Sequence, residues 1–259
     1  MGGGVAEGDM KRAIAAAGLI VLSALRGAAS GVYEADAQVP DSVGVMVVEV
    51  RAGTQDVSVT PGDVADISQE AADEASWFGE TAGQVRLERE GNRLYAWIEA
   101  DGPFAAPLQG RICLRVPKGA SITVRTSSGN VHVEGVNGKV DVSTASGSVD
   151  LHRVHGRVVV DSVSGDVVLD ALDGPLNART DSGRIEGHFL VLSDYCELGS
   201  VSGSIDLSLA SGLEMIGFDL RSVSGTIRLG TIRTERGLRM GFGRALLRAR
   251  TVSGSVSIQ

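Results

Sequence analysis

Residues 126–151 read TSSGNVHVEGVNGKVDVSTASGSVDL, and they hold two copies of one unit, a Ser-Gly dipeptide followed two residues later by Val. With Val or Ile in the last place, the unit occurs at seven positions: Ser128, Ser146, Ser164, Ser182, Ser202, Ser224 and Ser253. The first three intervals are 18 residues, and the next three are 20, 22 and 29. Such a period is typical of a solenoid, in which each coil buries its apolar edge by stacking on its neighbours.

Apolar and polar residues alternate on both sides of each Ser-Gly. Val or Ile stands three residues after the Ser, and a mostly aliphatic column stands five residues after it. Apolar side chains also stand six and four residues before it. A period of two is that of a half-buried strand. The sequence therefore predicts an all-β fold, a parallel β-solenoid of about seven coils with two short strands each.

Two further columns belong to the turns. A hydroxyl column is expected to satisfy backbone groups of the turns: Thr126, Thr144, Ser162, Thr180, Ser200, Ser222 and Thr251. A linking apolar column is expected to be buried: Val136, Val154, Leu172, Leu190, Ala210 and Ile232. Because Ser and Gly are common turn residues, we interpret those of the repeats as structural and not catalytic.

The first 30 residues differ from the rest. Lys11 and Arg12 precede an apolar run over residues 13–25 and then small residues, the pattern of a secretory signal. Translation could begin at Met1 or Met10, cleavage could follow Ser30 or Ala37, and an uncleaved leader is the alternative. The run is too short to span a bilayer, so we expect no membrane span in the mature chain. Export would place the protein in the periplasm, at the cell surface or outside the cell.

Residues 31–120 are expected to form an irregular β-rich cap, and residues 121–259 the solenoid repeats. Strands are predicted over residues 43–50, 56–60 and 110–116, and a hairpin over 84–88 and 94–99. The acidic stretch 63–80 is expected to be a loop or a short helix. The opposite end is expected to be open, because the last strand, ending at Gln259, has no following segment to cover it.

Charge is unevenly distributed. The net charge of -8 argues against a nucleic-acid-binding protein, but residues 211–259 hold 8 basic and 3 acidic side chains. The Arg-rich tail within it, residues 228–250, could meet a polyanion such as an acidic surface glycan or form a solvated outer face. Cys196 falls in a buried column and Cys113 in an outward position. Four intervening coil spacings of about 4.8 Å would separate them too far for a disulfide, so two free thiols are expected.

No constellation of catalytic, cofactor-binding or metal-ligating residues is found in the sequence. The four histidines, His132, His152, His155 and His188, are scattered over outward positions. The aspartates of the middle coils fall in five different columns, which disfavours a carboxylate pair: Asp161, Asp166, Asp170, Asp173 and Asp181. Glu186 beside Asp206 is a weak cation candidate, since calcium takes six or more oxygen ligands, and we expect Asp206 to pair with Arg228 instead.

The turn at residues 116–119, VPKG, followed by T-x-S-G-x-V units from Thr126, resembles the bacterial putative adhesin family of β-strand-repeat envelope proteins. The likeness covers roughly residues 40–259. It implies an exported β-solenoid-like domain without a known catalytic site.

Three functions are compatible with this pattern. The first is a non-catalytic adhesin or envelope interaction module whose flat outer faces bind a protein or glycan. The second is a self-assembling scaffold, in which the uncovered last coil templates another chain end to end. The third is a polysaccharide-acting enzyme, which would need converging carboxylates. No cofactor and no nucleic-acid partner are expected.

Overall fold

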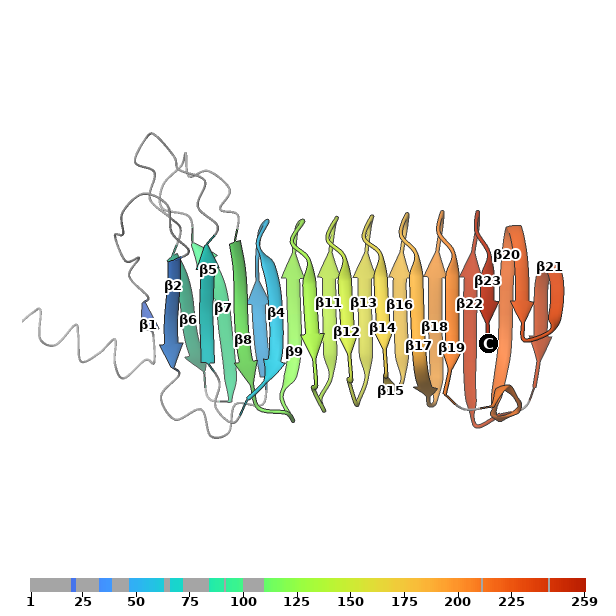
Figure 1. Cartoon of the computed structure of the whole chain (residues 1–259), viewed down its shortest axis with the longest axis horizontal. Coiled ribbons are helices and arrows are strands. Elements are labelled where there is room, and N and C mark those ends of the chain that lie inside the picture. The colour runs from blue at the N-terminus through green and yellow to red at the C-terminus, as the bar shows by residue number, and fades with distance from the viewer. Residues whose placement is uncertain are drawn as a thin grey trace, which may run out of the picture.

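The computed structural model describes residues 20–21, 33–38, 47–62, 66–71, 84–90, 92–99, 110–210, 212–241 and 243–259. Within these ranges the regular structure is β-strand apart from one 3-10 turn, η1 (Leu213–Met215). The strands stand side by side along the axis of an elongated stack (Figure 1). The predicted all-β solenoid is thus confirmed. Most of the leader lies outside the described residues, so the leader and the three region boundaries stay predictions.

Each regular coil gives one strand to each of two parallel rows. The first row contains β9 (Ser121–Thr126), β11 (Val140–Thr144), β13 (Val158–Ser162), β16 (Leu176–Thr180), β18 (Tyr195–Ser200) and β22 (Ala245–Thr251). The second row contains β10 (Val131–Glu134), β12 (Val149–His152), β14 (Val167–Asp170), β17 (Ile185–Leu192), β19 (Ile205–Leu209) and β23 (Val256–Ile258). A two-residue strand, β15 (Asp173–Gly174), pairs with the end of β17.

An aliphatic core lies between the two rows. All four predicted apolar columns are buried over the seven repeats. Parallel pairing places like beside like, so that Val140 lies opposite both Ile122 and Val158. Removing such ladders from water contributes about 25 cal/mol per Å² of apolar area. The stacked columns are therefore what holds the coils together.

The hydroxyl column is buried beneath the Ser-Gly turns, and Thr180 and Ser200 join their own turns to the turn of the preceding coil. The Thr180 hydroxyl accepts the Gly183 N–H at 3.0 Å and donates to the Gly165 carbonyl at 3.2 Å. Ser200 repeats this pattern with the Gly203 N–H at 2.8 Å and the Gly183 carbonyl at 3.2 Å. These bonds satisfy turn groups that the strands leave unpaired, as predicted.

The order of the last coils differs from the order of the sequence. Strand β22 lies between β18 and β20 (Ile216–Leu229), and β23 lies between β19 and the second half of β20. The chain therefore skips one place after β19, builds the outer coil with β20, and returns to fill the gap. The predicted open end at Gln259 is wrong, because β23 is paired on both sides.

This order also corrects two smaller predictions. Ser257 lies opposite both Asp206 and Arg228, so these two residues are separated by one strand and do not pair. Asp206 instead accepts a hydrogen bond from the Ser204 hydroxyl at 3.2 Å. The linking column is buried through Leu190, but Ala210 and Ile232 are exposed, because the chain leaves the regular coils after Ala210 and Ile232 begins the antiparallel edge strand β21 (Ile232–Met240).

The far end of the stack is formed by β21 (Ile232–Met240), which pairs antiparallel with β20. Within the described residues β20 is its one partner, so β21 is an edge strand. Arg233, Arg236 and Arg239 place charge on it, and Arg236 has a φ of 75° where the pairing register shifts. Charge and irregularity on an edge oppose the addition of another strand. The expectation of end-to-end association rests on an uncovered last strand, but β23 is instead paired on both sides. Association itself stays a prediction.

The N-terminal end is built in the same manner. Strands β3 (Val47–Arg51) and β4 (Asp56–Pro61) lie between the coil of β9 and β10 and the coil of β7 (Arg93–Glu99) and β8 (Gly110–Val116). Parallel pairing thus continues N-terminal to Ser121. Antiparallel strands β5 (Asp66–Ala71) and β6 (Gln84–Glu90) lie outside them, followed by β2 (Tyr33–Gln38) and β1 (Ile20–Val21).

The predicted hairpin of β6 and β7 is confirmed. The expectation of a loop or helix over residues 63–80 is wrong for residues 66–71, which form β5, and residues 72–80 lie outside the described residues. Strand β5 pairs with β2 on one side and with β8 on the other, and this pairing explains why the acidic segment is extended.

No disulfide links the two cysteines, as predicted: Cys113 is half-buried and Cys196 is buried. Cys113 lies in β8, in the second row, and Cys196 lies in β18, in the first row. The coil of β3 and β4 lies between β8 and the regular coils, so the two thiols are farther apart than the sequence predicted.

Candidate functional site

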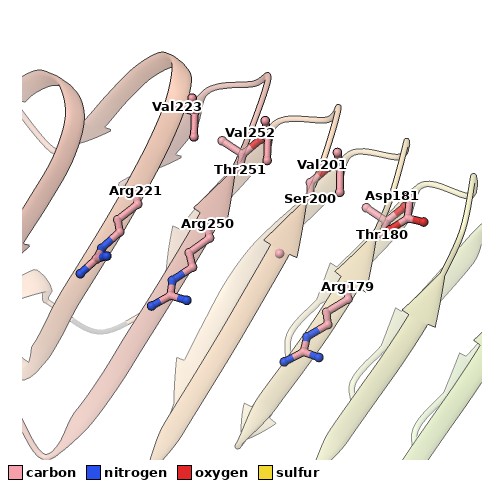
Figure 2. Close-up of a pocket in the computed structure, with 11 residues that line it drawn as sticks. Arg179, Thr180, Asp181, Ser200, Val201, Arg221, Val223, Arg250, Thr251 and Val252 are labelled. Atoms are coloured by element: carbon pink, nitrogen blue, oxygen red, sulfur yellow. The ribbon is translucent and has the colours of Figure 1, made fainter.

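A shallow groove of about 400 Å³ crosses the outer face of the first row near the C-terminal end of the stack. Three arginines from neighbouring strands point the same way along it (Figure 2). We call Arg179, Arg250 and Arg221 the arginine row. Gly199 lies in the same column, between Arg179 and Arg250.

Strand alternation and coil order place these side chains together. Thr180, Ser200 and Thr251 face the core, so the residue before each of them faces outward. Pairing puts Arg179 opposite Gly199, Gly199 opposite Arg250, and Arg250 opposite Arg221. Neighbouring strands are about 4.8 Å apart. Arg250 and Arg221 are thus direct neighbours, whereas Gly199 leaves a gap between Arg250 and Arg179.

The arginine row is only partly neutralised. Arg179 lies 3.3 Å from Glu197, and the Arg221 Nε donates to Asp219 at 3.2 Å. The Arg250 side chain makes no hydrogen bond or ion pair within the part of the chain that the structure describes. Like charges on adjacent strands repel each other, so Arg250 beside Arg221 costs stability unless an anion lies nearby.

Asp219 is a buried carboxylate that gathers the surrounding arginines. Its oxygens lie 3.2–3.4 Å from Arg221, Arg239 and Arg248. Burial alone would raise the pKa of Asp219, but hydrogen bonds and charge from Arg221, and then from Arg239, outweigh it and lower the pKa. One ionised carboxylate therefore faces three guanidinium groups, which leaves this part of the surface positive.

Arg248 extends the polar surface toward β18. Its Nη1 donates to the Tyr195 hydroxyl at 2.7 Å, and its guanidinium lies 5.4 Å from the centre of that ring. The stacked arrangement fixes both side chains, since a cation over an aromatic face is attracted by it.

A row of exposed valines borders the groove. Val201, Val252 and Val223 are 47%, 46% and 73% exposed, and Asp181 continues their line next to Val201 (Figure 2). The groove therefore offers guanidinium donors on one side, apolar surface on the other, and one carboxylate acceptor at its end.

The histidines lie outside this groove. The rings of His132 and His152 are 5.3 Å apart, and His152 Nδ1 lies 3.4 Å from Asp170. Burial and then the charge of His152 lower the pKa of His132. His188 Nε2 lies 3.4 Å from Glu186, and His155 is exposed. The His132 and His152 contact was not predicted.

The carboxylates considered in the sequence do not converge. Asp166 accepts the Arg184 N–H at 2.7 Å, and Asp170 contacts His152. Glu186 does lie opposite Asp206, as predicted. No group of three or more potential metal ligands occurs among the residues that the structure describes.

The predicted Arg-rich tail contributes Arg239, Arg248 and Arg250 to the groove and its surroundings. Sequence reasoning missed Arg179, Arg221 and the role of Gly199. The signal was present, because Arg179, Gly199, Arg221 and Arg250 each stand three residues before a repeat Ser.

Residues 120–259 match the Toastrack DUF4097 family model, and the chain belongs to this family. No functionally curated protein matches the chain. Among solved structures it is similar to a putative cell adhesion protein from Clostridium sporogenes, with 11% identity, a TM-score of 0.43, and 88% of this chain and 99% of that chain covered. It is also similar to a putative adhesin from Bacteroides fragilis, with 11% identity, a TM-score of 0.46, and 89% and 98% covered.

Within the described ranges, none of the helical structure is long and apolar enough to cross a bilayer.

Proposed function

We propose that this protein is a non-catalytic, exported interaction module of the adhesin type, which binds an anionic component of a cell envelope. The observation that carries the proposal is the arginine row. Arg250 lies beside Arg221 with no counter-ion of its own among the described residues, although the chain as a whole carries a charge of -8. A cationic strip on an acidic protein supports a local and specific contact with a negative partner.

The form of the surface supports binding more than catalysis. The groove is open, and its arginines lie in a line across neighbouring strands instead of converging on one point. A catalytic centre needs an acid or base within hydrogen-bond reach of one reacting atom. A line of equivalent groups is suited to a repetitive ligand, for which several weak contacts add up.

Binding of the full chain to isolated cell envelopes, measured by surface plasmon resonance, tests the proposal. We expect saturable binding that weakens with salt, because exposed charges are screened within about 8–10 Å at moderate ionic strength. The R179Q/R250Q double variant should bind at least about tenfold more weakly. Arg125 lies in the same outward column outside the groove, so R125Q is the matched control and should bind normally.

Absence of envelope binding, or binding that the double variant leaves unchanged, would contradict the proposal. Export is tested separately by locating the mature N-terminus in fractionated cells. A full-length chain found in the cytoplasm would exclude an envelope role.

A further inference from the structure

Gly199 is a glycine that the backbone does not require. It lies inside β18, its φ is not in the left-handed region, and an added Cβ would meet nothing closer than the Arg179 Cγ at 3.7 Å. By contrast, a Cβ on Gly203 would lie 1.8 Å from the Gly183 carbonyl oxygen. Glycine inside a strand weakens the strand and often marks a place where a ligand comes close.

Polar and apolar side chains surround the gap at Gly199, and Glu197, which faces outward on the same strand, lies 3.3 Å from Arg179. Arg179 and Arg250 flank it within the column, and Val201 and Val252 border it toward the turns. The exposed Asp181 stands at one end of the valine line (Figure 2). A ring placed over Gly199 would thus have a guanidinium on either side and apolar surface along one edge.

We infer that the gap at Gly199 is the seat of one sugar ring of an acidic polysaccharide that lies along the arginine row, with its carboxylates on Arg179 and Arg250. Guanidinium forks bind carboxylates bidentately. This inference rests on the proposed function and names the ligand of the same site.

The surroundings of the gap favour a glycan over an acidic peptide. β18 is paired on both sides, by β16 and β22, so an incoming peptide finds no free strand edge to join. Asp181 repels a ligand that carries only carboxylates, but it accepts hydrogen bonds from hydroxyl groups. The valines contact the C–H faces of a pyranose ring. A polymer that bears both hydroxyls and carboxylates satisfies all three kinds of group.

Calorimetric titration of the full chain with polygalacturonate tests the inference. Fully methyl-esterified polygalacturonate has the same backbone without charge, and poly-L-glutamate has the charge without sugar rings. We expect binding of polygalacturonate, and at least about tenfold weaker binding of both comparison polymers.

Two variants separate charge from space. R250Q removes a guanidinium, whereas G199V fills the gap with a side chain that suits a strand and leaves the charge unchanged. Both should weaken polygalacturonate binding at least about tenfold. S143A, in the same column outside the groove, should bind normally. A melting temperature for each variant separates loss of the site from loss of the fold.

Different failures have different meanings. If R250Q weakens polygalacturonate binding and a folded G199V variant does not, the arginine row binds anions, but the placement of a sugar ring in the gap at Gly199 is refuted. If poly-L-glutamate binds as well as polygalacturonate, the ligand class is refuted. In both cases envelope binding that depends on the arginine row would remain, so the proposed function would stand. Failure of polygalacturonate to bind, with envelope binding intact, would overturn this inference alone.

Discussion

Gly199 and Gly203 lie four positions apart in the chain, and replacing each with Ala should have different effects on stability. In G203A the new Cβ would lie 1.8 Å from the Gly183 carbonyl oxygen and 2.8 Å from the Ser200 hydroxyl. Carbon atoms do not approach an oxygen so closely, so the turn must move away from its neighbour. In G199A the nearest atom is 3.7 Å away, which is an ordinary contact.

The cost of the movement follows from the bonds that it strains. They are the Ser200 hydroxyl to the Gly183 carbonyl, the Gly203 N–H to Ser200, and the Ser202 N–H to the Asp181 carbonyl. At about 1 kcal/mol for each hydrogen bond, G203A should lose about 3 kcal/mol of unfolding free energy. For a chain of this size, that corresponds to a fall in melting temperature of about 6–12 °C. G199A should be neutral or gain up to about 1 kcal/mol, because Ala restricts the unfolded chain.

Thermal unfolding of both variants and the unchanged protein, followed by circular dichroism, measures the difference. Equal melting temperatures for G203A and G199A would refute the close stacking of the Ser-Gly turns.

Three further predictions concern the core and the titrating groups. L198A, in the fully buried column of β18, should lose about 2–5 kcal/mol in urea unfolding, and a loss below about 1 kcal/mol would place that column at the surface. Because the pKa of Asp219 is lowered, its ionised form stabilises the fold above the ordinary aspartate pKa, and this contribution is lost as the pH falls through the lowered value. D219N should therefore flatten the acid side of a plot of melting temperature against pH, and an unchanged slope would contradict the arginine contacts. The lowered pKa of His132 means that the unfolded chain binds more protons as the pH falls below the ordinary histidine value, so stability drops there. H132Q should remove that drop in chemical denaturation at pH values on either side of about 6.5, and retention of the full drop would assign it to other groups.

The repeat pattern predicts which side chains face inward, because burial in a strand depends only on alternation. The apolar columns and the hydroxyls of Thr180 and Ser200 are examples. The pattern does not predict which coils are neighbours. Every coil presents the same ladder of backbone groups and aliphatic side chains, so β22 can pair with β18 as readily as β20 could. The long interval between Ser224 and Ser253 signals that a strand is inserted, but its direction depends on the whole stack.

The candidate site was partly predictable for the same reason. Arg179, Arg221 and Arg250 share a repeat position, which places them on one face. That Arg250 lies next to Gly199, and Arg221 beyond it, depends on the coil order. The uncompensated charge of Arg250 depends on the position of Asp219, which no local pattern specifies.

Disulfide trapping at the second row tests the coil order most directly. Asp206 lies opposite Ser257 on adjacent parallel strands, about 4.8 Å apart, whereas Asp206 and Arg228 are two strand spacings apart. Cα atoms 4.4–6.8 Å apart can be bridged, as a general rule for disulfides. We expect the D206C/S257C variant to form its disulfide under mild oxidation and D206C/R228C to form none, as mapped by mass spectrometry. A disulfide in D206C/R228C, with none in D206C/S257C, would show that the coils stack in sequence order and would refute the position of β23 between β19 and β20.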